Sequence, residues 1–175
     1  RVEHADLAFC VGWNRLIPPW MLARYRLGVL GIHAVNSFLP NGCGRSPINW
    51  SIIEGADHVN LHILRLSELA DRGDLWGVLR VPINPQDTID TMQSKCVVEF
   101  VLEIKRRLDE LRSGELRTMP QGYRGDGTAL RKRTPRDGRI RWWWSVRRVC
   151  DAVRAQCLPY PGAWAVHGLQ EFAVQ

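Results

Sequence analysis

The sequence predicts an α/β fold with a mostly parallel sheet. Residues 6–12 and 29–33 are short, continuously apolar runs, which is the pattern of strands buried on both faces. Between them, Pro18 and Pro19 open a short helix through Leu22, because proline is tolerated in the first turn of a helix. A strand, a helix and a second strand in this order form a βαβ unit, whose two strands run parallel.

Three further elements are expected after the second strand. Ser46 and Pro47 have the pattern of a helix start, with Ser46 as the cap, and they predict a helix over residues 47–53. Residues 60–66 alternate between polar and apolar side chains, as a half-buried strand does. Residues 76–81 form another strand-like run after an acidic loop.

The longest predicted helix begins near Asp87 and ends near Gly114, because its apolar residues recur at roughly helical spacing. Residues 118–141 are rich in Gly, Pro and Arg and are expected to be extended. A last helix is predicted over residues 145–157, where two following prolines end it. The tail, residues 166–175, carries no readable pattern.

Composition limits the possible functions. A chain of 175 residues and 20.0 kDa suits one domain with a small extension, and a charged residue interrupts every long apolar run, so no membrane span is predicted. The net charge of +6 and pI near 9.4 are compatible with an anionic ligand such as a nucleotide phosphate, or with RNA. Much of the excess positive charge lies between Arg131 and Arg141, and this segment is either a solvated loop or a phosphate site.

The cysteines argue against two further classes of protein. There are five of them, an odd number, and no pair has the spacing Cys-x-x-Cys. A disulfide framework and a zinc site are therefore not expected, and a reducing cytoplasm fits best.

Two segments could carry acid–base chemistry. His33 lies at the carboxyl end of a predicted strand, where open α/β sheets bind ligands, and Asn36 follows in the same loop. A histidine can act as a general base near neutral pH and an asparagine can stabilise a developing oxyanion, although His33 could equally be a buried structural residue. Asp71, in the segment Asp71-Arg72-Gly73-Asp74, could orient His33, or the segment could be a plain turn.

Two other segments are open to more than one interpretation. The loop 41–46 contains two glycines but lacks the spacing of a phosphate-binding P-loop, which favours a tight turn. The aromatic run Trp142-Trp143-Trp144 lies beside basic residues and could stack on nucleic-acid bases. Packing of the last helix onto the sheet is the favoured role for these tryptophans.

Several motifs, in this order, resemble the folate-dependent formyltransferase family, which includes methionyl-tRNA formyltransferase and the sugar N-formyltransferases. They are Ser37-Phe38-Leu39-Pro40, Gly44-Arg45-Ser46-Pro47-Ile48-Asn49-Trp50 and Asp71-Arg72-Gly73-Asp74-Leu75. Segments 83–88, 133–140 and 159–164 resemble later motifs of the family. The resemblance covers nearly the whole chain and implies a Rossmann-like formyltransferase domain.

The resemblance also implies a domain organisation. Residues 1–115 would be the C-terminal portion of the Rossmann-like catalytic domain, including the long helix. Residues 116–175 would form a small C-terminal extension of an extended segment and a terminal helix. Because the sequence starts with Arg1 and enters a strand almost at once, it is expected to lack the N-terminal portion of the domain.

Two features favour the sugar branch of the family. Residues 12–17 resemble the strand and loop of the sugar enzymes, and the run Arg133-Thr134-Pro135-Arg136-Asp137-Gly138 is typical of them. A fragment of a methionyl-tRNA formyltransferase is the first alternative. A catalytically impaired relative that only binds folate or a nucleotide is the second.

The chain departs from the family pattern at one motif. The family has Asn-x-His just before its Ser-Leu-Leu-Pro run, and an ungapped alignment places His33 at the Asn position and Val35 at the His position. A two-residue insertion, Val35-Asn36, would instead place His33 at the His position and Gly31 at the Asn position. Asn36 could then replace the missing Asn. Cys43 stands where the family usually has Arg.

The resemblance implies a reaction and its participants. N10-formyltetrahydrofolate would donate a formyl group to the amine of a nucleotide-linked amino sugar, with His33, Asn36 and Asp71 as catalytic residues. The folate would lie near two loops, at Trp13, Asn14, Leu16 and Ile17 and at Glu68, Leu69 and Ala70. No metal, no membrane and, outside the tRNA alternative, no nucleic acid is expected; a homodimer is compatible with the sequence.

Overall fold

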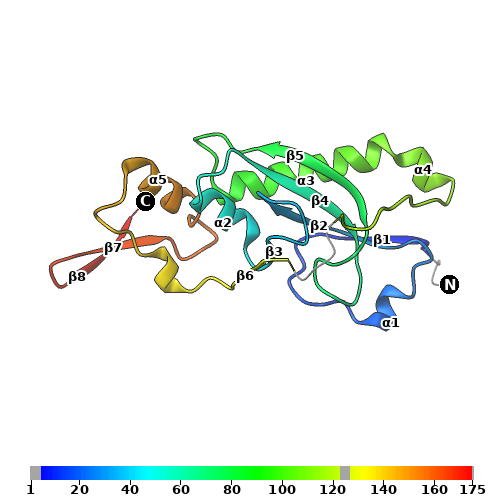
Figure 1. Ribbon diagram of the computed structural model, residues 1–175, viewed down its shortest axis with the longest axis horizontal. Helices are drawn as coiled ribbons and strands as arrows, with labels where there is room; N and C mark the ends of the chain where they lie inside the picture. Colours follow the sequence, from blue (N-terminus) through cyan, green and yellow to red (C-terminus); the bar gives the residue numbers. More distant parts are fainter. Residues whose placement is uncertain (1–4, 123–126, 175) are drawn as a thin grey trace.

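The computed structural model describes residues 5–122 and 127–174 of the protein. Their main sheet has the strand order β1-β2-β4-β5 (Figure 1). The strands are β1 (Leu7–Cys10), β2 (Gly28–Val35), β4 (His58–Arg65) and β5 (Leu75–Pro82). The predicted α/β class is confirmed, as is the βαβ unit, because β1 and β2 pair parallel across the short helix α1 (Pro19–Leu22).

The sheet differs from the expected mostly parallel one in its other pairings. β2 pairs antiparallel with β4, and β4 pairs antiparallel with β5. Val35, at the end of β2, lies opposite Asn60, near the start of β4, so β4 begins at the edge where β2 ends. β5 returns from β4 through a loop without a helix, and such a direct return produces an antiparallel pair.

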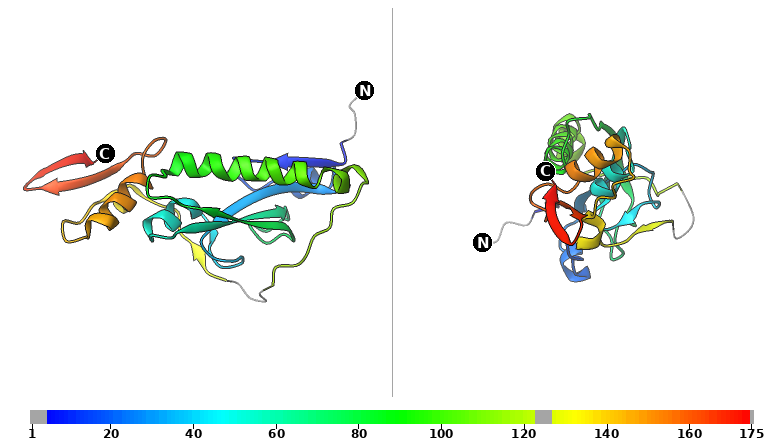
Figure 2. Two further views of the ribbon diagram at one scale, coloured as in Figure 1. Left: turned by 90° about the horizontal axis from the view of Figure 1, so that it is seen from above. Right: turned by 90° about the vertical axis from the view of Figure 1, so that its left-hand side faces the viewer.

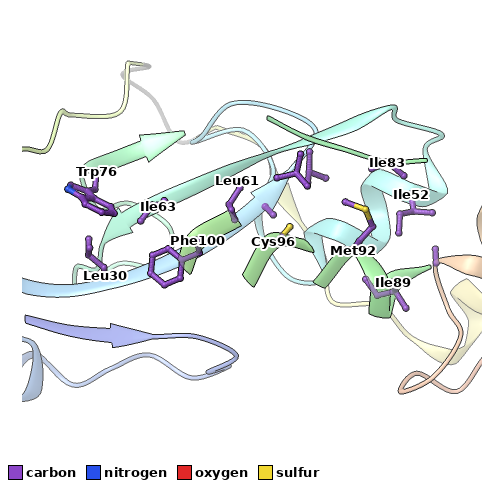
Figure 3. Packing of buried hydrophobic residues seen from close by; sticks show 14 residues of the cluster. Leu30, Ile52, Leu61, Ile63, Trp76, Ile83, Ile89, Met92, Cys96 and Phe100 are labelled. Atoms are coloured by element: carbon purple, nitrogen blue, oxygen red, sulfur yellow. The ribbon is translucent and has the colours of Figure 1, made fainter. Parts of the chain in front are cut away.

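Helix α3 (Ile89–Arg106) lies along one face of this sheet (Figure 2). Phe100 and Cys96 of α3 lie near Leu30 and Leu61 of the strands, and Met92 lies near Ile52 and Ile83; all belong to the hydrophobic core (Figure 3). The opposite face of the sheet is covered by a smaller cluster that contains Leu39, Cys43 and Leu64. Because both faces are covered, β4 is buried from Val59 to Leu64 and is not the half-buried strand that its alternation predicted.

The predicted helix from Asp87 to Gly114 is two helices. Thr88 caps α3, since its hydroxyl accepts a hydrogen bond from the Thr91 amide at 3.3 Å. The helical path breaks at Arg107 (φ −107°, ψ 20°), and α4 (Leu108–Arg112) follows.

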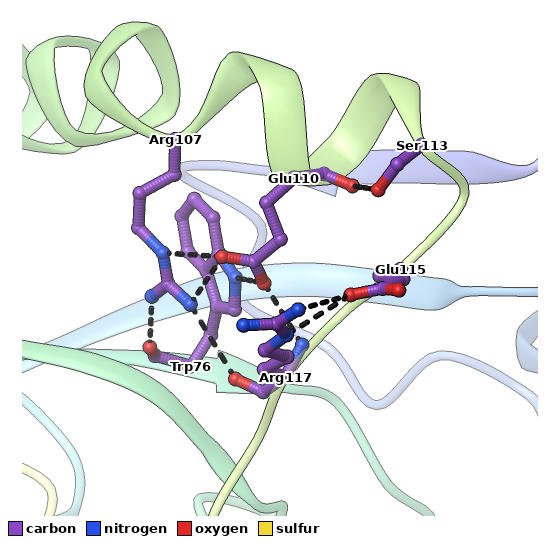
Figure 4. A network of polar contacts seen from close by, with 6 residues as sticks. All are labelled: Trp76, Arg107, Glu110, Ser113, Glu115 and Arg117. Atoms are coloured by element: carbon purple, nitrogen blue, oxygen red, sulfur yellow. Dashed lines mark hydrogen bonds and ion pairs between the residues drawn. The ribbon is translucent and has the colours of Figure 1, made fainter.

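Figure 4 shows what fixes the break. The Arg107 guanidinium lies 4.1 Å from the Trp76 ring centre and donates to Glu110 at 2.8 Å. Glu110 also accepts from the Trp76 indole at 3.1 Å and from the Arg117 amide at 2.9 Å. This network ties α4 and the segment after it to β5.

Helix α2 (Pro47–Ile53) follows the Pro-started prediction, with one correction at its first residue. Ser46 has a left-handed backbone (φ +56°) and makes no capping hydrogen bond through its side chain, because a capping side chain requires an extended backbone at that position. The helix start is therefore supported by Pro47 alone.

The C-terminal part pairs back onto the rest of the chain. β6 (Ala129–Leu130) forms a parallel pair with β3 (Cys43–Gly44), and the short 3-10 helix η1 (Pro135–Gly138) follows. α5 (Val146–Arg154) is the predicted last helix. The tail forms an unpredicted hairpin of β7 (Ala163–His167) and β8 (Gln170–Val174).

This hairpin packs on α5. Ala163 and Ala165 alternate along β7 and are buried with Ala152 of α5, whereas Gly168 turns the chain with φ +60°. The expected packing role of the tryptophan run holds for Trp144, which packs against this cluster, while Trp142 and Trp143 are exposed.

Candidate active site

His33 and Asp71, far apart in the sequence, lie side by side. Nδ1 of His33 is 3.2 Å from Oδ1 of Asp71. His33 is on β2, near its carboxyl end, and Asp71 is in the loop between β4 and β5. The structure therefore brings together the imidazole and the carboxylate on which the predicted chemistry depends.

The loop holds Asp71 in a defined position. Asp71 has a left-handed backbone (φ +56°), which Asp tolerates better than most residues, and its Oδ2 accepts from the Gly44 amide at 2.9 Å. The Gln121 side chain donates to the carbonyl oxygens of Asp71 and Gly73, at 2.7 and 3.0 Å. A Cβ on Gly73 would lie 1.8 Å from the Arg65 carbonyl oxygen, so only glycine fits there.

Both nitrogens of His33 face acceptors. Nδ1 faces Asp71, and Nε2 lies 2.8 Å from the carbonyl oxygen of Gly42. A neutral imidazole carries one N–H and can donate to one of these acceptors, whereas a doubly protonated ring can donate to both. The two contacts fix the orientation of the imidazole ring next to the Asp71 carboxylate.

The surroundings of Asp71 favour the ionised form of its carboxyl group. Burial raises the pKa of the Asp71 carboxyl, but hydrogen bonding and charge from His33, with the Gly44 amide, outweigh burial and lower the pKa overall. The His33 side chain is 6% exposed and that of Asp71 is 21% exposed. Asp71 is thus the member of the pair that a substrate can reach.

His62 supports the pair from the neighbouring strand, a role that no sequence pattern indicates. Its Nδ1 lies 3.2 Å from the His33 carbonyl oxygen, and its Nε2 accepts from the Leu39 amide at 3.3 Å. Burial lowers the pKa of His62 to about 4, so it is neutral near pH 7 with its proton on Nδ1. An alternating strand pattern places a histidine on β4, but it does not show which backbone groups the ring will meet.

Asn36 lies apart from the pair. Its side-chain amide donates to Glu54 at 2.9 Å, and its backbone amide donates to the Ser51 hydroxyl at 3.0 Å. To act as an oxyanion donor, Asn36 would have to leave Glu54, so this role stays a prediction. Val35, the residue at the family's His position in the ungapped alignment, is buried.

A pocket of about 480 Å³ lies beside the loop that carries Asp71. Its lining includes Leu22, Gly28, Arg65, Leu66, Glu68 and Arg72. Among the residues predicted to bind folate, Glu68 lines this pocket. Sequence reasoning missed the other lining residues because α1 and the ends of β2 and β4 come together only in the folded chain.

The remaining predicted folate residues lie outside the lining of this pocket. Trp13, Leu16 and Leu69 are large apolar side chains exposed to solvent. The Asn14 carbonyl oxygen accepts from Arg45 at 3.4 Å. Ile17 is half-buried and Ala70 is exposed. The folate-binding role of all seven residues stays a prediction.

Over residues 5–122 and 127–174, no three His, Cys, Asp or Glu side chains gather as metal ligands would. In the same ranges, no helix combines the length and apolarity that crossing a bilayer requires.

The fold and the site together define a class: an α/β protein that places a histidine and a carboxylate at the end of a sheet strand, beside a pocket. The chain belongs to the formyl transferase family. The sequence model of that family, described as formyl transferase, matches residues 1–99. A second model, described as the formyl transferase C-terminal domain, matches residues 132–175. The predicted family is confirmed.

Similar proteins fall into several groups. A methionyl-tRNA formyltransferase of Sorangium cellulosum (strain So ce56) is 32% identical over 161 residues, which are 91% of this chain and 50% of the relative. The chain thus spans about half the length of that curated relative.

Solved structures share the fold. HypX from Aquifex aeolicus in complex with tetrahydrofolic acid superposes with a TM-score of 0.73 at 25% identity, over 91% of this chain and 27% of HypX. A sugar N-formyltransferase from Shewanella sp. gives a TM-score of 0.68 at 17% identity, over 97% of this chain and 68% of that one.

Proposed function

We propose that this chain contributes the catalytic centre for formyl transfer from N10-formyltetrahydrofolate to the amine of a nucleotide-linked amino sugar. The observation that carries the proposal is the pairing of His33 with Asp71 at 3.2 Å, at the place where the family resemblance puts the catalytic groups. Membership of the formyl transferase family supports the reaction type.

The pocket beside Asp71 suits a folate. Leu22 and Leu66 give it apolar walls for a flat heteroaromatic ring, while Arg65 and Arg72 add positive charge for an anionic ligand. Glu68 can accept hydrogen bonds from ring N–H groups. When bound, the donor supplies a formyl carbonyl that an amine can attack.

The residues of the pair divide the remaining chemistry between them. Asp71 takes the proton that the amine nitrogen loses as the new C–N bond forms, and returns it to the carrier nitrogen as the old bond breaks. His33 holds Asp71 ionised and oriented. General acid–base help of this kind contributes roughly 10²–10⁴ in rate.

Two acceptors have support. The sugar acceptor is favoured by the motif 133–138 and agrees with the activity named for the Shewanella structure. The second candidate, the amino group of methionyl-tRNA, is favoured by the 32% identical relative.

A transfer assay decides between them. The longest natural polypeptide that contains this sequence is incubated with N10-formyltetrahydrofolate and either several nucleotide-linked amino sugars or methionyl-tRNA. We expect formylation of an amino sugar, and we expect Asp71→Asn to abolish it while the protein stays folded at the assay temperature, because the amide cannot accept the amine proton. Asp109→Asn is the control, since Asp109 is fully exposed on α4.

Each other outcome has a definite meaning. Formylation of the tRNA alone would establish the second candidate. Near-normal turnover in Asp71→Asn would remove Asp71 from the mechanism. Folate binding without transfer to any acceptor would identify a binding protein and refute the proposed reaction.

A further inference from the structure

The positive charge of the chain is concentrated in its C-terminal part. Residues 127–175 contain nine Arg and Lys and three Asp and Glu, a surplus of six that equals the net charge of the whole chain. Residues 1–126 contain fifteen of each sign and are neutral. Such asymmetry indicates that one part of a protein meets an anionic partner.

The basic segment starts at the candidate active site. β6 pairs with β3, and the amide of Gly44 in β3 is the group that binds the Asp71 carboxylate. Arg131 directly follows β6, and the Leu130 carbonyl oxygen accepts from the Arg45 amide at 3.1 Å. The first cations of the segment are therefore attached to the same small sheet that positions Asp71.

The cations next to this sheet form what we term the 131–136 cluster, consisting of Arg131, Lys132, Arg133 and Arg136. It is organised around Trp50 of α2, whose indole donates to the Arg131 carbonyl oxygen at 3.2 Å. The guanidinium groups of Arg131 and Arg133 lie 5.0 and 5.9 Å from the Trp50 ring centre. Their positions are thus set by packing as well as by charge.

Among the described residues, one carboxylate, that of Asp137, pairs with this cluster. It accepts from Arg131 through both oxygens and from the Thr134 hydroxyl at 3.1 Å. Arg133 instead donates to the neutral side chain of Gln156, and its Nε is buried without an acceptor among the described residues. The cluster therefore keeps a surplus of positive charge that the described part of the chain does not neutralise.

We propose that the 131–136 cluster binds the diphosphate of a nucleoside diphosphate, and thereby holds the acceptor substrate next to Asp71. This inference rests on the proposed function and names the part of the acceptor that is recognised. A guanidinium group binds phosphate oxygens through two parallel N–H donors, and an ammonium group adds a point charge. Arg131 is attached through Asp137, so Arg133, Lys132 and Arg136 supply the binding charge.

Calorimetric titration tests the site without any formyl donor. Uridine diphosphate is titrated into the wild-type protein, Arg133→Gln and the double variant Lys132→Gln/Arg136→Gln. We expect binding to weaken at least about tenfold in each, because each loses charge-assisted hydrogen bonds to phosphate. Inorganic pyrophosphate should compete with uridine diphosphate. Arg112→Gln, an exposed arginine on α4, is the matched control and should bind normally.

Several results would overturn the proposal. They are an absence of uridine diphosphate binding to the wild-type protein, unchanged binding in the variants, and failure of pyrophosphate to compete. If Arg133→Gln melts early, the double variant decides, since Lys132 and Arg136 are exposed. Binding of a short RNA with steep salt dependence, without competition by uridine diphosphate, would assign the cluster to RNA and also reject the proposal.

The binding test of the phosphate site and the transfer assay of the proposed reaction can fail independently. Uridine diphosphate binding without any formyl transfer would reject the proposed reaction and retain the phosphate site. Transfer to an amino sugar that is unaffected in Arg133→Gln and in the double variant would retain the proposed reaction and reject the phosphate site.

Discussion

Acidification should destabilise this protein through His62. The ring is fully buried between the His33 carbonyl oxygen and the Leu39 amide, and burial lowers its pKa from 6.5 to about 4. In the unfolded chain the same histidine takes up its proton near pH 6.5. The stabilisation is therefore complete above about pH 6.5 and is lost as the pH falls toward about 4.

The size of the effect follows from the shift. Each unit of pKa difference corresponds to about 1.4 kcal/mol, so between about pH 7 and about pH 4.5 His62 alone removes roughly 2 kcal/mol of unfolding free energy. Folded-state protonation would also remove the acceptor for the Leu39 amide, since a doubly protonated ring can only donate.

Urea unfolding at these two pH values, for the wild type and for His62→Gln, isolates this contribution. Glutamine does not titrate, and effects of the other carboxylates and histidines cancel in the comparison. The variant should therefore lose roughly 2 kcal/mol less than the wild type on acidification. His167→Gln, at an exposed position of β7, is the control and should follow the wild type. Equal acid loss in His62→Gln and wild type would refute the buried, neutral ring.

Two further predictions concern packing. Phe100→Ala should lower the unfolding free energy by about 3–5 kcal/mol in urea titrations, because it leaves a cavity in the centre of the core. Val98→Ala, on the exposed side of the same helix, should change the unfolding free energy by less than about 1 kcal/mol, and similar losses in the two variants would contradict the assigned core. Gly73→Ala should lower the unfolding free energy by at least about 1–3 kcal/mol, because its Cβ would meet the Arg65 carbonyl oxygen. Gly122→Ala, with open space around it, should leave the melting temperature unchanged, and an unchanged melting temperature in Gly73→Ala would disprove the tight loop.

Much of the fold could be predicted from local pattern. The apolar runs of β1 and β2 and the prolines at the starts of α1 and α2 are signals that a short window contains. The direction of β4 and β5 could not be predicted in that way, since antiparallel pairing depends on where the chain re-enters the sheet. The hairpin of β7 and β8 was missed because its buried residues are alanines, which give little contrast in hydropathy.

The candidate site, like the fold, could be predicted only in part from local sequence pattern. His33 and Asp71 could be identified because their motifs resemble a family, and their pairing at 3.2 Å agrees with that reasoning. His62 and Gln121 act through backbone carbonyl groups of distant segments, and neither residue type nor spacing predicts such contacts. The Asn36 prediction relied on sequence proximity to His33, but in the structure its side chain meets Glu54.

The pairing of β3 with β6 has a consequence for dividing this protein into modules. The two family models match residues 1–99 and 132–175. The stretch between them contains Gln121, whose side chain donates to the Asp71 carbonyl oxygen, and β6, which pairs with the strand that carries the Gly44 amide. Chimeras joined at the edges of the two matched regions would thus exchange the scaffold of the acid–base pair while leaving the pair itself untouched. Swaps between relatives should carry this intervening stretch along with the N-terminal module.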